Sequence, residues 1–335
     1  MSDDLILLDH GSGGKASHRL IAEYLAPAFK NPILDSMGDG AILDINGCRL
    51  AYSTDTFVVD PIFFPGGDIG DLAVNGTVND VAMCGATPLF ISVGLILEEG
   101  FAFCDLKKIV ASMKKAADKA GVKVVTGDTK VVPKGKVDKI FINTSGIGVL
   151  GSGVDIGPHK IKSGDSVILS GTMGDHGVAV LAHREGIDFQ STIKSDTVSL
   201  AGMVKSLMDK VTVSALRDPT RGGVGTTLCE IAEESNLGIK LMETSLPIDT
   251  QVKAACDFLG LDPMYVANEG KLLCFVAEEF EEMALATLRQ NSNGKNAAVI
   301  GRVINENPGR VVMETAIGGL RIVDMLTGEQ LPRIC

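Results

Sequence analysis

The chain has 335 residues, 45% of them apolar and 22% charged, and a formal net charge of -11. This length suits two domains of about 150 residues each, and the acidic balance argues against a nucleic-acid partner because phosphate backbones bind basic surfaces. No run reaches the length of a membrane span and the start lacks the regions of a signal peptide, so we expect a cytoplasmic protein with no membrane partner. Seven cysteines without a Cys-x-x-Cys pair indicate neither a disulfide framework nor a zinc ribbon.

Apolar spacing in the first half of the chain predicts three helices and two strands. A glycine-rich loop over 10–14 precedes a helix over 16–29. Two further helices are expected over 71–84 and 105–120, and the second has one apolar stripe opposite its lysines and Gly121 at its end. The two strands are expected over 49–59 and 139–150.

A turn-rich stretch around 151–153 marks the expected boundary between two domains. Helices and strands do not alternate strictly in either half, so an α+β architecture is favoured over a doubly wound sheet. We expect domains over 1–153 and 154–317, each a mixed or antiparallel sheet packed with helices, and a mobile tail over 318–335. The elements expected in the second half are strands over 166–170, 271–277, 297–304 and 310–314, and helices after Gly223 and over 280–290.

Five acidic residues lie in short loops or at strand ends, beside small or polar neighbours. Several carboxylates without an accompanying His or Cys pair are hard oxygen ligands, which suit Mg²⁺ bridging the phosphates of ATP. Any one of them alone is more often a turn residue, because Asp and Gly are the commonest turn formers. Together they predict a metal site made of Asp39, Asp55, Asp80, Asp128 and Asp218.

The loop formed by His10, Gly11, Ser12, Gly13 and Gly14 is a candidate phosphate cradle, since its backbone amides stand just before a predicted helix. By itself this signal is weak. The loop has neither the spacing of a Walker motif nor the preceding strand of a dinucleotide fingerprint. His10 suits a helix cap or a packing position equally well.

Four other residues are candidates for chemistry. Glu269 stands just before an apolar strand, where a solvated acid is the ordinary interpretation, and only proximity to Lys130 would make the two an acid/base couple. His176 is expected to have a structural role in a loop. Cys335 is the last residue, and a thiol at a mobile chain end could reach its own active site or a partner's. A surface thiol of no consequence is the alternative.

Together these segments resemble the PurM-like ATP-binding superfamily and, within it, the HypE family of hydrogenase-maturation carbamoyl dehydratases. The resemblance covers nearly the whole chain. Its motifs, which superfamily members with other chemistry share, lie at 10–14, 53–56, 79–80, 127–132, 220–223 and 268–271. The ending Pro332-Arg333-Ile334-Cys335 is what specifies the HypE family.

The resemblance implies a reaction on the protein's own tail. A carbamoyltransferase, HypF, would load a carbamoyl group onto Cys335, and ATP with Mg²⁺ would drive its dehydration to a thiocyanate. The cyano group would then pass to iron on a HypC-HypD complex, for the cyanide ligands of nickel-iron hydrogenase.

The resemblance also assigns roles to residues. Lys130 and Glu269 match the family's acid/base positions, and Asp80 is the foremost metal ligand. A homodimer is implied, formed by strands of the N-terminal, ATP-binding domain pairing across a twofold axis into a barrel-like sheet. Nucleotide contacts are implied for the glycine-rich loop and for Thr54, Asn79, Gly127 and Thr129.

Two other interpretations stay open. One is a different enzyme of the superfamily, such as a selenophosphate synthetase, an aminoimidazole-ribotide synthetase or a thiamine-monophosphate kinase. Selenophosphate synthetases typically carry a cysteine near the glycine-rich loop, whereas the first cysteine here is Cys48, and the others have no use for a terminal thiol. The second is a non-catalytic thiol carrier gated by nucleotide, which would need neither Lys130 nor Glu269.

Overall fold

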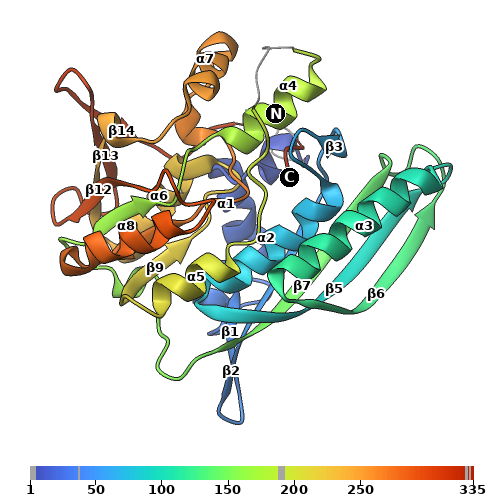
Figure 1. Cartoon of the computed structure of the whole chain (residues 1–335), viewed down its shortest axis with the longest axis horizontal. Coiled ribbons are helices and arrows are strands. Elements are labelled where there is room, and N and C mark those ends of the chain that lie inside the picture. Colours follow the sequence, from blue (N-terminus) through green and yellow to red (C-terminus); the bar gives the residue numbers. More distant parts are fainter. Residues whose placement is uncertain (1–4, 37, 188–192, 329–330, 332) are drawn as a thin grey trace.

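The N-terminal domain is built on a five-stranded mixed sheet with helices on one face (Figure 1). The computed structural model describes residues 5–36, 38–187, 193–328, 331 and 333–335. In the strand order β1-β2-β7-β5-β6, only the β5–β6 pair is parallel. The strands are β1 Ala41–Ile45, β2 Cys48–Phe57, β5 Ala86–Glu98, β6 Lys123–Val132 and β7 Ile140–Leu150.

Two helices, α2 Ile69–Met83 and α3 Phe103–Ala120, cover the inner face of this sheet. A short hairpin, β3 Phe63–Phe64 and β4 Gly67–Asp68, leads into α2. The carboxylate of Asp68 caps α2 by accepting hydrogen bonds from the backbone N–H groups of its first turn. Apolar residues of α2, α3 and the inner face form one buried core.

The outer face of the same sheet is open. Tyr52, Ile147 and Phe90 lie side by side in register on β2, β7 and β5, and their exposed fractions are 40%, 38% and 42%. Ile96 on the same face is 42% exposed. An apolar stripe of this kind on an exposed sheet face is a typical contact surface.

The second domain contains a seven-stranded sheet in the order β14-β13-β10-β12-β8-β11-β9. Its central strands are buried on both faces, because helices lie on either side. The strands are β8 Ser166–Leu169, β9 Val213–Arg217, β10 Gly238–Met242, β11 Leu273–Val276, β12 Ala298–Ile304, β13 Val311–Glu314 and β14 Leu320–Val323.

One core of this domain packs α6 Gly223–Ser235 against one face of the sheet, and another packs α5 Ala201–Met208 and α8 Glu281–Gln290 against the other. Helices α4 Asp175–Arg184 and α7 Thr250–Leu259 form a smaller cluster at one end. In the described part of the chain, no helix combines the length and apolar character that crossing a membrane requires.

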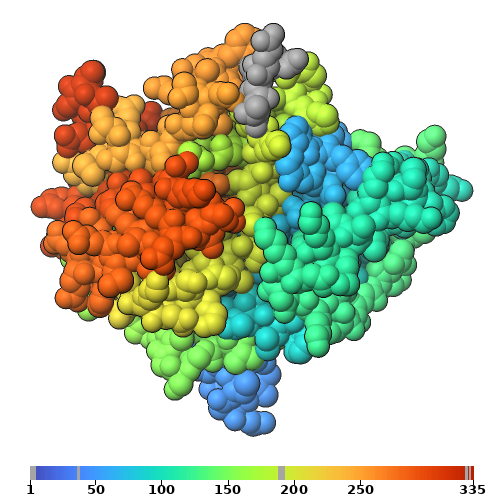
Figure 2. Space-filling model, viewed as in Figure 1, coloured from blue at the N-terminus to red at the C-terminus, as the bar shows by residue number. Residues whose placement is uncertain are grey.

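The two domains are joined by buried contacts along a continuous surface (Figure 2). The end of α2 packs into the α5–α8 core of the second domain. Asn79 of α2 is buried, and its amide donates to the carbonyl of Val198 (3.0 Å) and accepts from the N–H of Leu200 (2.7 Å). These buried contacts therefore hold residues of both domains together at one junction.

Several expectations need correction. The helix expected over 16–29 is α1 Lys15–Leu20 followed by a π-turn, Ile21–Leu25, and none of these residues is buried, so little packing supports a regular helix. Segment 127–130 lies in the middle of β6 and not in a loop. This edge strand is exposed on both faces, so its sequence lacks the alternation of apolar and polar residues that predicts a strand. The tail boundary at 318 is wrong, because β14 pairs with β13. Residues 329, 330 and 332 lie outside the described residues.

Candidate active site

The last residues of the chain are docked against the segment that follows β2. The backbone N–H of Val58 donates to an oxygen of Cys335 (3.1 Å), and that of Asp60 donates to the carbonyl of Arg333 (3.1 Å). Arg333 in turn donates from Nε to the carbonyl of Val58 (2.9 Å) and pairs with Asp138. The chain end thus lies beside residues 58–60 as an added strand would. The structure holds the chain end in a bound position, and its mobility stays a prediction.

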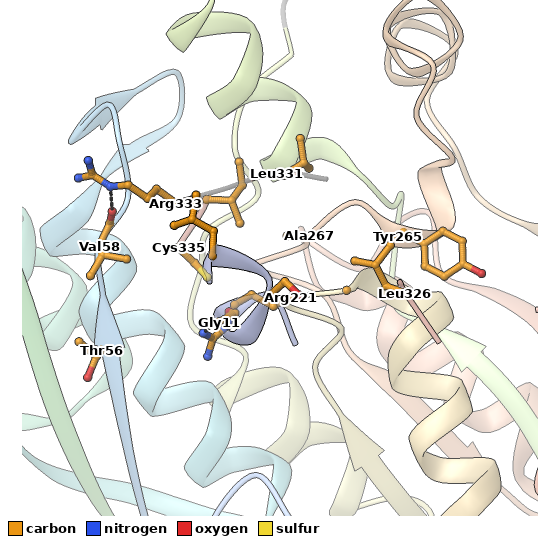
Figure 3. Close-up of a pocket in the computed structure, with 14 residues that line it drawn as sticks. Gly11, Thr56, Val58, Arg221, Tyr265, Ala267, Leu326, Leu331, Arg333 and Cys335 are labelled. Carbon is orange, nitrogen blue, oxygen red and sulfur yellow. Dashed lines mark hydrogen bonds between the residues drawn. The ribbon is translucent and has the colours of Figure 1, made fainter. Parts of the chain in front are cut away.

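The side chain of Cys335 points into a cavity of about 320 Å³ between the domains (Figure 3). Thr56 and Val58 line it from the first domain, and Arg221 lines it from the second. Gly11 and Ser12 of the predicted phosphate loop also line this cavity. The terminal thiol and residues predicted to bind nucleotide therefore share one cavity.

Arg221 connects this thiol to the predicted metal site. Its guanidinium donates to the carbonyl of Gly11 (3.2 Å) and lies 3.9 Å from the carboxylate of Asp55. Burial raises the pKa of the Cys335 thiol, the charge of Arg221 opposes that rise, and the acids Glu269 and Asp55 add to it. In the docked position the free cysteine is consequently held as a neutral thiol.

Four of the five predicted acids interact with one another at the domain junction: Asp39, Asp55, Asp80 and Asp218. Burial raises the pKa of Asp80 well above its ordinary value, and the charges of the other three raise it further. Burial also raises the pKa of Asp218 to about 8 and that of Asp39 to about 6, the latter against the opposing charge of Arg217. A buried group of like charges such as this one is stabilised by added positive charge.

Local contacts fix these acids in place. Asp80 lies in the last turn of α2, and the Ser53 hydroxyl of β2 shares its hydrogen between the carboxylate of Asp80 (2.8 Å) and the carbonyl of Asp39 (2.9 Å). Asp218 follows directly after β9, whose last residue, Arg217, pairs with Asp39 at 2.9 Å. The acids of the first domain are thus held against the second.

Glu269 lies beside the same group and is almost wholly buried, with 3% of its surface exposed. Burial raises its pKa well above the ordinary value, and the negative charges of Asp196, Asp55 and Asp218 add to this. Its Oε1 atom has no hydrogen-bond partner among the described residues. A buried carboxyl oxygen without a partner is a place where a substrate N–H group can bind.

The glycine-rich loop contributes to the cavity only in part. His10 turns back on its own segment, where Nδ1 accepts a hydrogen bond from the N–H of Leu7 (3.0 Å). Gly14 lies so close to the second domain that an added Cβ would come within 2.4 Å of the carbonyl of Leu326, which explains why glycine is needed there. Gly13 lies against Arg221 in the left-handed region, with φ +77°. Phosphate binding by this loop stays a prediction.

The β6 residues do not reach the acid group within this chain. Asp128 of β6 lies in register with Gly94 of β5, Asn143 of β7 and Thr56 of β2. Thr56 is the neighbour of Asp55 in the sequence, so three strand spacings separate Asp128 from that position. That separation is about 14 Å for strands spaced about 4.8 Å apart. Lys130 pairs with Asp128 at 2.6 Å, and both side chains are more than two-thirds exposed. The structure thus keeps the proposed acid/base pair apart, and it leaves Gly127 and Thr129 on the same exposed edge strand.

Two further predicted nucleotide contacts have partners inside the protein. Thr54 lies on the outer face of β2, where its hydroxyl accepts from Ser145 (2.9 Å) and donates to the carbonyl of Thr144 (3.1 Å). The Asn79 amide is used in the contacts between domains described above. Their part in nucleotide binding stays a prediction.

The acid group fits a divalent cation in its chemistry but offers no complete ligand set. Burial and the charges of the neighbouring acids raise the pKa values of Asp80 and Asp218, and carboxylates are oxygen ligands that Mg²⁺ takes. Among the described residues, however, no three His, Cys, Asp or Glu side chains are arranged to hold an ion. A cation there would need further oxygen ligands, as Mg²⁺ obtains from phosphates and water.

Two residues that contact the cavity or the docked tail were not among the predicted site residues. Arg221 was part of a quoted motif but was given no role, although a lone cation following Asp218 among acidic motifs was a usable signal. His176 is buried in the first turn of α4, not in a loop, and contacts the docked tail. No sequence signal could have linked it to residue 334.

Comparisons with known proteins show the family of this chain. Residues 37–150 match the family "AIR synthase related protein, N-terminal domain" and residues 162–314 match its C-terminal domain. Carbamoyl dehydratase HypE of Azotobacter vinelandii is 50% identical over 97% of this chain and 96% of that protein. The crystal structure of a HypE–HypF complex has a TM-score of 0.87 at 49% identity, over 92% of this chain and 99% of that one. HypE in complex with ATP has a TM-score of 0.84 at 52% identity, over 99% and 100%.

Proposed function

The chain belongs to the HypE family of carbamoyl dehydratases, and we propose that it uses ATP to dehydrate a carbamoyl group carried on its own Cys335 to a thiocyanate. The single observation that carries this proposal is the docked tail, which brings the terminal thiol beside Arg221, Asp55 and Glu269. Because the reacting group is tethered, it meets the site in an intramolecular step with a high effective concentration.

The first chemical step activates a poor leaving group. The carbamoyl oxygen attacks the γ-phosphorus of ATP, ADP leaves, and the oxygen becomes a phosphate ester while one proton is lost from the amide nitrogen. Arg221 stands beside Cys335 and supplies positive charge where the negative charge of this transfer develops. The glycine-rich loop lies close enough to the thiol to hold phosphate oxygens with its N–H groups.

Mg²⁺, when bound with ATP, neutralises phosphate charge during the transfer. Asp39, Asp55, Asp80 and Asp218 are the residues that would hold it, with phosphate oxygens completing the ligand set. A role in binding a cation would account for a group of acids whose negative charges repel one another when no cation is bound. A cation bound to these four acids would lower their pKa and favour their ionised form.

The second step removes the remaining N–H proton as phosphate leaves, which forms the carbon–nitrogen triple bond. Glu269 accepts a proton from the amide nitrogen, and its raised pKa makes it a stronger base once it is ionised. The balance is one carbamoyl group and one ATP giving one thiocyanate, ADP and phosphate, since the water formally lost from the amide is consumed by ATP hydrolysis.

Lys130 acts in a neighbouring copy of the chain. A homodimer formed through the open sheet face would cover Tyr52, Phe90 and Ile147 and bring the exposed β6 of one copy toward the acid group of the other. The open apolar face and the separation of Asp128 from the other acids support this arrangement. Asp128 and Lys130 then serve the partner's site.

The tail also exchanges groups with other proteins. A carbamoyltransferase of the HypF type loads Cys335, in line with the solved complex of the relative, and a HypC-HypD complex receives the cyano group for the iron of nickel-iron hydrogenase. Both require the chain end to leave its docked position. All seven cysteines are free thiols, which suits a reducing cytoplasm.

Intact-mass analysis tests the proposal. The protein is loaded with HypF, carbamoyl phosphate and ATP, purified, and then given fresh Mg-ATP. We expect a gain of one carbamoyl group at Cys335 and then loss of one water, and Glu269→Gln should load without losing water. A Cys335→Ala chain that still gained the group would refute the tail as substrate. Loading without any loss of water in the wild type would favour a non-catalytic carrier.

A further inference from the structure

The docked chain end is held by a buried histidine that the mechanism has not used. His176 is the second residue of α4 and is fully buried, with the edge of Phe64 against its ring. Its Nε2 lies 2.7 Å from the carbonyl oxygen of Ile334, the residue just before Cys335. This is a direct bond from the body of the second domain to the peptide unit next to the terminal thiol.

The direction of each hydrogen bond follows from chemistry. A carbonyl oxygen only accepts, so Nε2 carries the hydrogen and donates to Ile334. Burial lowers the pKa of His176, so the ring is neutral and Nδ1 accepts. The donor is the hydroxyl of Ser195, at 2.8 Å, whose oxygen accepts in turn from the N–H of Thr197 (3.1 Å). The ring is therefore fixed in one tautomer and one orientation.

The other contacts of the chain end lie on either side of this bond. Val58 holds the backbone of Cys335, and Arg333 is anchored to Val58 and Asp138. The Ile334 side chain is 4% exposed and packs into the core of the first domain. Only His176 holds the Ile334 carbonyl from the second domain, among the described residues. The bond thus fixes the last peptide unit between the two domains.

The segment that orients His176 also holds the proposed base. Asp196, next to Ser195, accepts a hydrogen bond from the backbone N–H of Glu269 (3.0 Å) and pairs with Lys271 at 2.9 Å. A single short segment therefore contacts the holder of the tail and the backbone of Glu269. The relative placement of the carried group and the base depends on it.

We propose that His176, oriented by Ser195, is a positioning residue that holds the Ile334 carbonyl and thereby places the group on Cys335 at the acid site for dehydration. The inference rests on the proposed function for its kinetic consequence. The docking role itself is independent of that function, because it concerns the free thiol as well.

Two substitutions at His176 separate this role from mere packing. The side-chain amide of Gln reaches the position of Nε2 and keeps a donor for the Ile334 carbonyl, whereas that of Asn reaches only the position of Nδ1. In the full-length protein without ligands, iodoacetamide should alkylate Cys335 about tenfold faster in His176→Asn than in the wild type, since a buried hydrogen bond is lost. His176→Gln should stay within about threefold of the wild type. The exposed Cys104 is the internal control and should not change.

Dehydration supplies the second readout. Each variant is loaded by HypF, purified, and mixed with Mg-ATP in a single turnover followed by intact mass. We expect His176→Asn to lose water about tenfold more slowly with loading not slowed, and His176→Gln to keep most of the rate. Ser195→Ala, which leaves the imidazole in place without its hydroxyl donor, should show a smaller change in the same direction in both assays.

The outcomes are distinguishable. Alkylation and dehydration of His176→Asn at wild-type rates would overturn the proposal, and so would equal damage by Asn and Gln, which would indicate packing alone. If the loaded wild type loses no water, the proposed function fails, while the alkylation rates still decide whether His176 holds the tail. If His176→Asn does not fold, Ser195→Ala decides, and unchanged alkylation of Cys335 there refutes the role.

Discussion

The acidic motifs of this chain lie in two regions with opposite character. Asp39, Asp55, Asp80 and Asp218 are gathered at the domain junction, where burial raises their pKa values and the neighbouring acids raise those of Asp80 and Asp218 further. Asp128, from another of the acidic motifs, lies on an edge strand with its neighbour Lys130, and both are exposed to solvent. The first region is assembled by the fold of one chain, and the second is presented outward.

This difference indicates how the work is divided. Under the proposed function, the groups held by buried contacts at the junction act on the tail of their own chain, which docks beside them. Groups on an exposed edge strand act where another surface meets them. We therefore propose that β6 serves the site of a partner chain.

The largest effect is expected from Asp80→Asn. Asp80 is the acid most strongly affected by the other three, so loss of its charge should weaken cation binding most and slow dehydration of the loaded protein by about 10³-fold. Single-turnover mass analysis measures this rate. Asp209→Asn, which removes an exposed acid paired with Lys205, is the matched control and should leave the rate unchanged. A residual rate within tenfold of the wild type would exclude Asp80 from the site.

Lys130→Ala should slow dehydration by about 10²-fold, as removal of a group that transfers protons does. If β6 serves the partner, mixing this variant with Asp80→Asn should restore water loss on the Lys130→Ala chains, since mixed dimers contain one complete site. The mass difference between the variants identifies which chain reacts. No recovery in subunit-exchanged mixtures would place Lys130 in its own chain.

Phe90→Asp should weaken self-association about tenfold or more, because a charge replaces an apolar side chain at the centre of the open sheet face. Sedimentation at several concentrations measures the change. Phe103→Asp, at an 80% exposed position on α3 and away from that face, serves as control. A Phe90→Asp protein that associates as strongly as the control would contradict the dimer surface.

The smallest effect concerns stability and pH. Burial raises the folded-state pKa of Asp218 to about 8, above its ordinary value near 4. The stability that its protonated form contributes is present below the ordinary pKa and is lost as pH rises through about 8. Asp218→Asn removes that loss, so its melting temperature should exceed the wild type's by roughly 3 °C above pH 8, and the difference should vanish as pH falls to about 4. Calorimetry without nucleotide measures both, and a lower melting temperature at high pH would contradict the crowding of charges.

Much of the fold was predictable because its signals are local. The stripe of α3 and the apolar runs of β7, β8 and β12 are found within a few residues of their expected positions. The long strands β5 and β6 were missed because the first carries glycine and proline and the second has no buried face. Periodicity cannot detect strands whose pattern is set by a partner sheet or a partner chain.

The site was predictable only in its residue types. The acidic motifs included the four acids of the junction, but nothing in the sequence around Asp128 distinguished it from Asp80. Burial by the second domain makes that distinction, and it is a tertiary property. The bond between His176 and Ile334 spans 158 positions of sequence and could be seen only in three dimensions.

The docked tail predicts that Cys335 reacts at the acid site of its own chain, and a mixture of two variants tests this directly. In a dimer of one Cys335→Ala chain and one Asp80→Asn chain, only the Asp80→Asn chain can carry the carbamoyl group. The acid site of that same chain is the damaged one. After loading and addition of Mg-ATP, we predict by intact mass that the Asp80→Asn chain keeps its carbamoyl group and loses no water. Loss of one water from that chain, at a rate approaching the wild type's, would show that the tail crosses to its partner and would contradict the account.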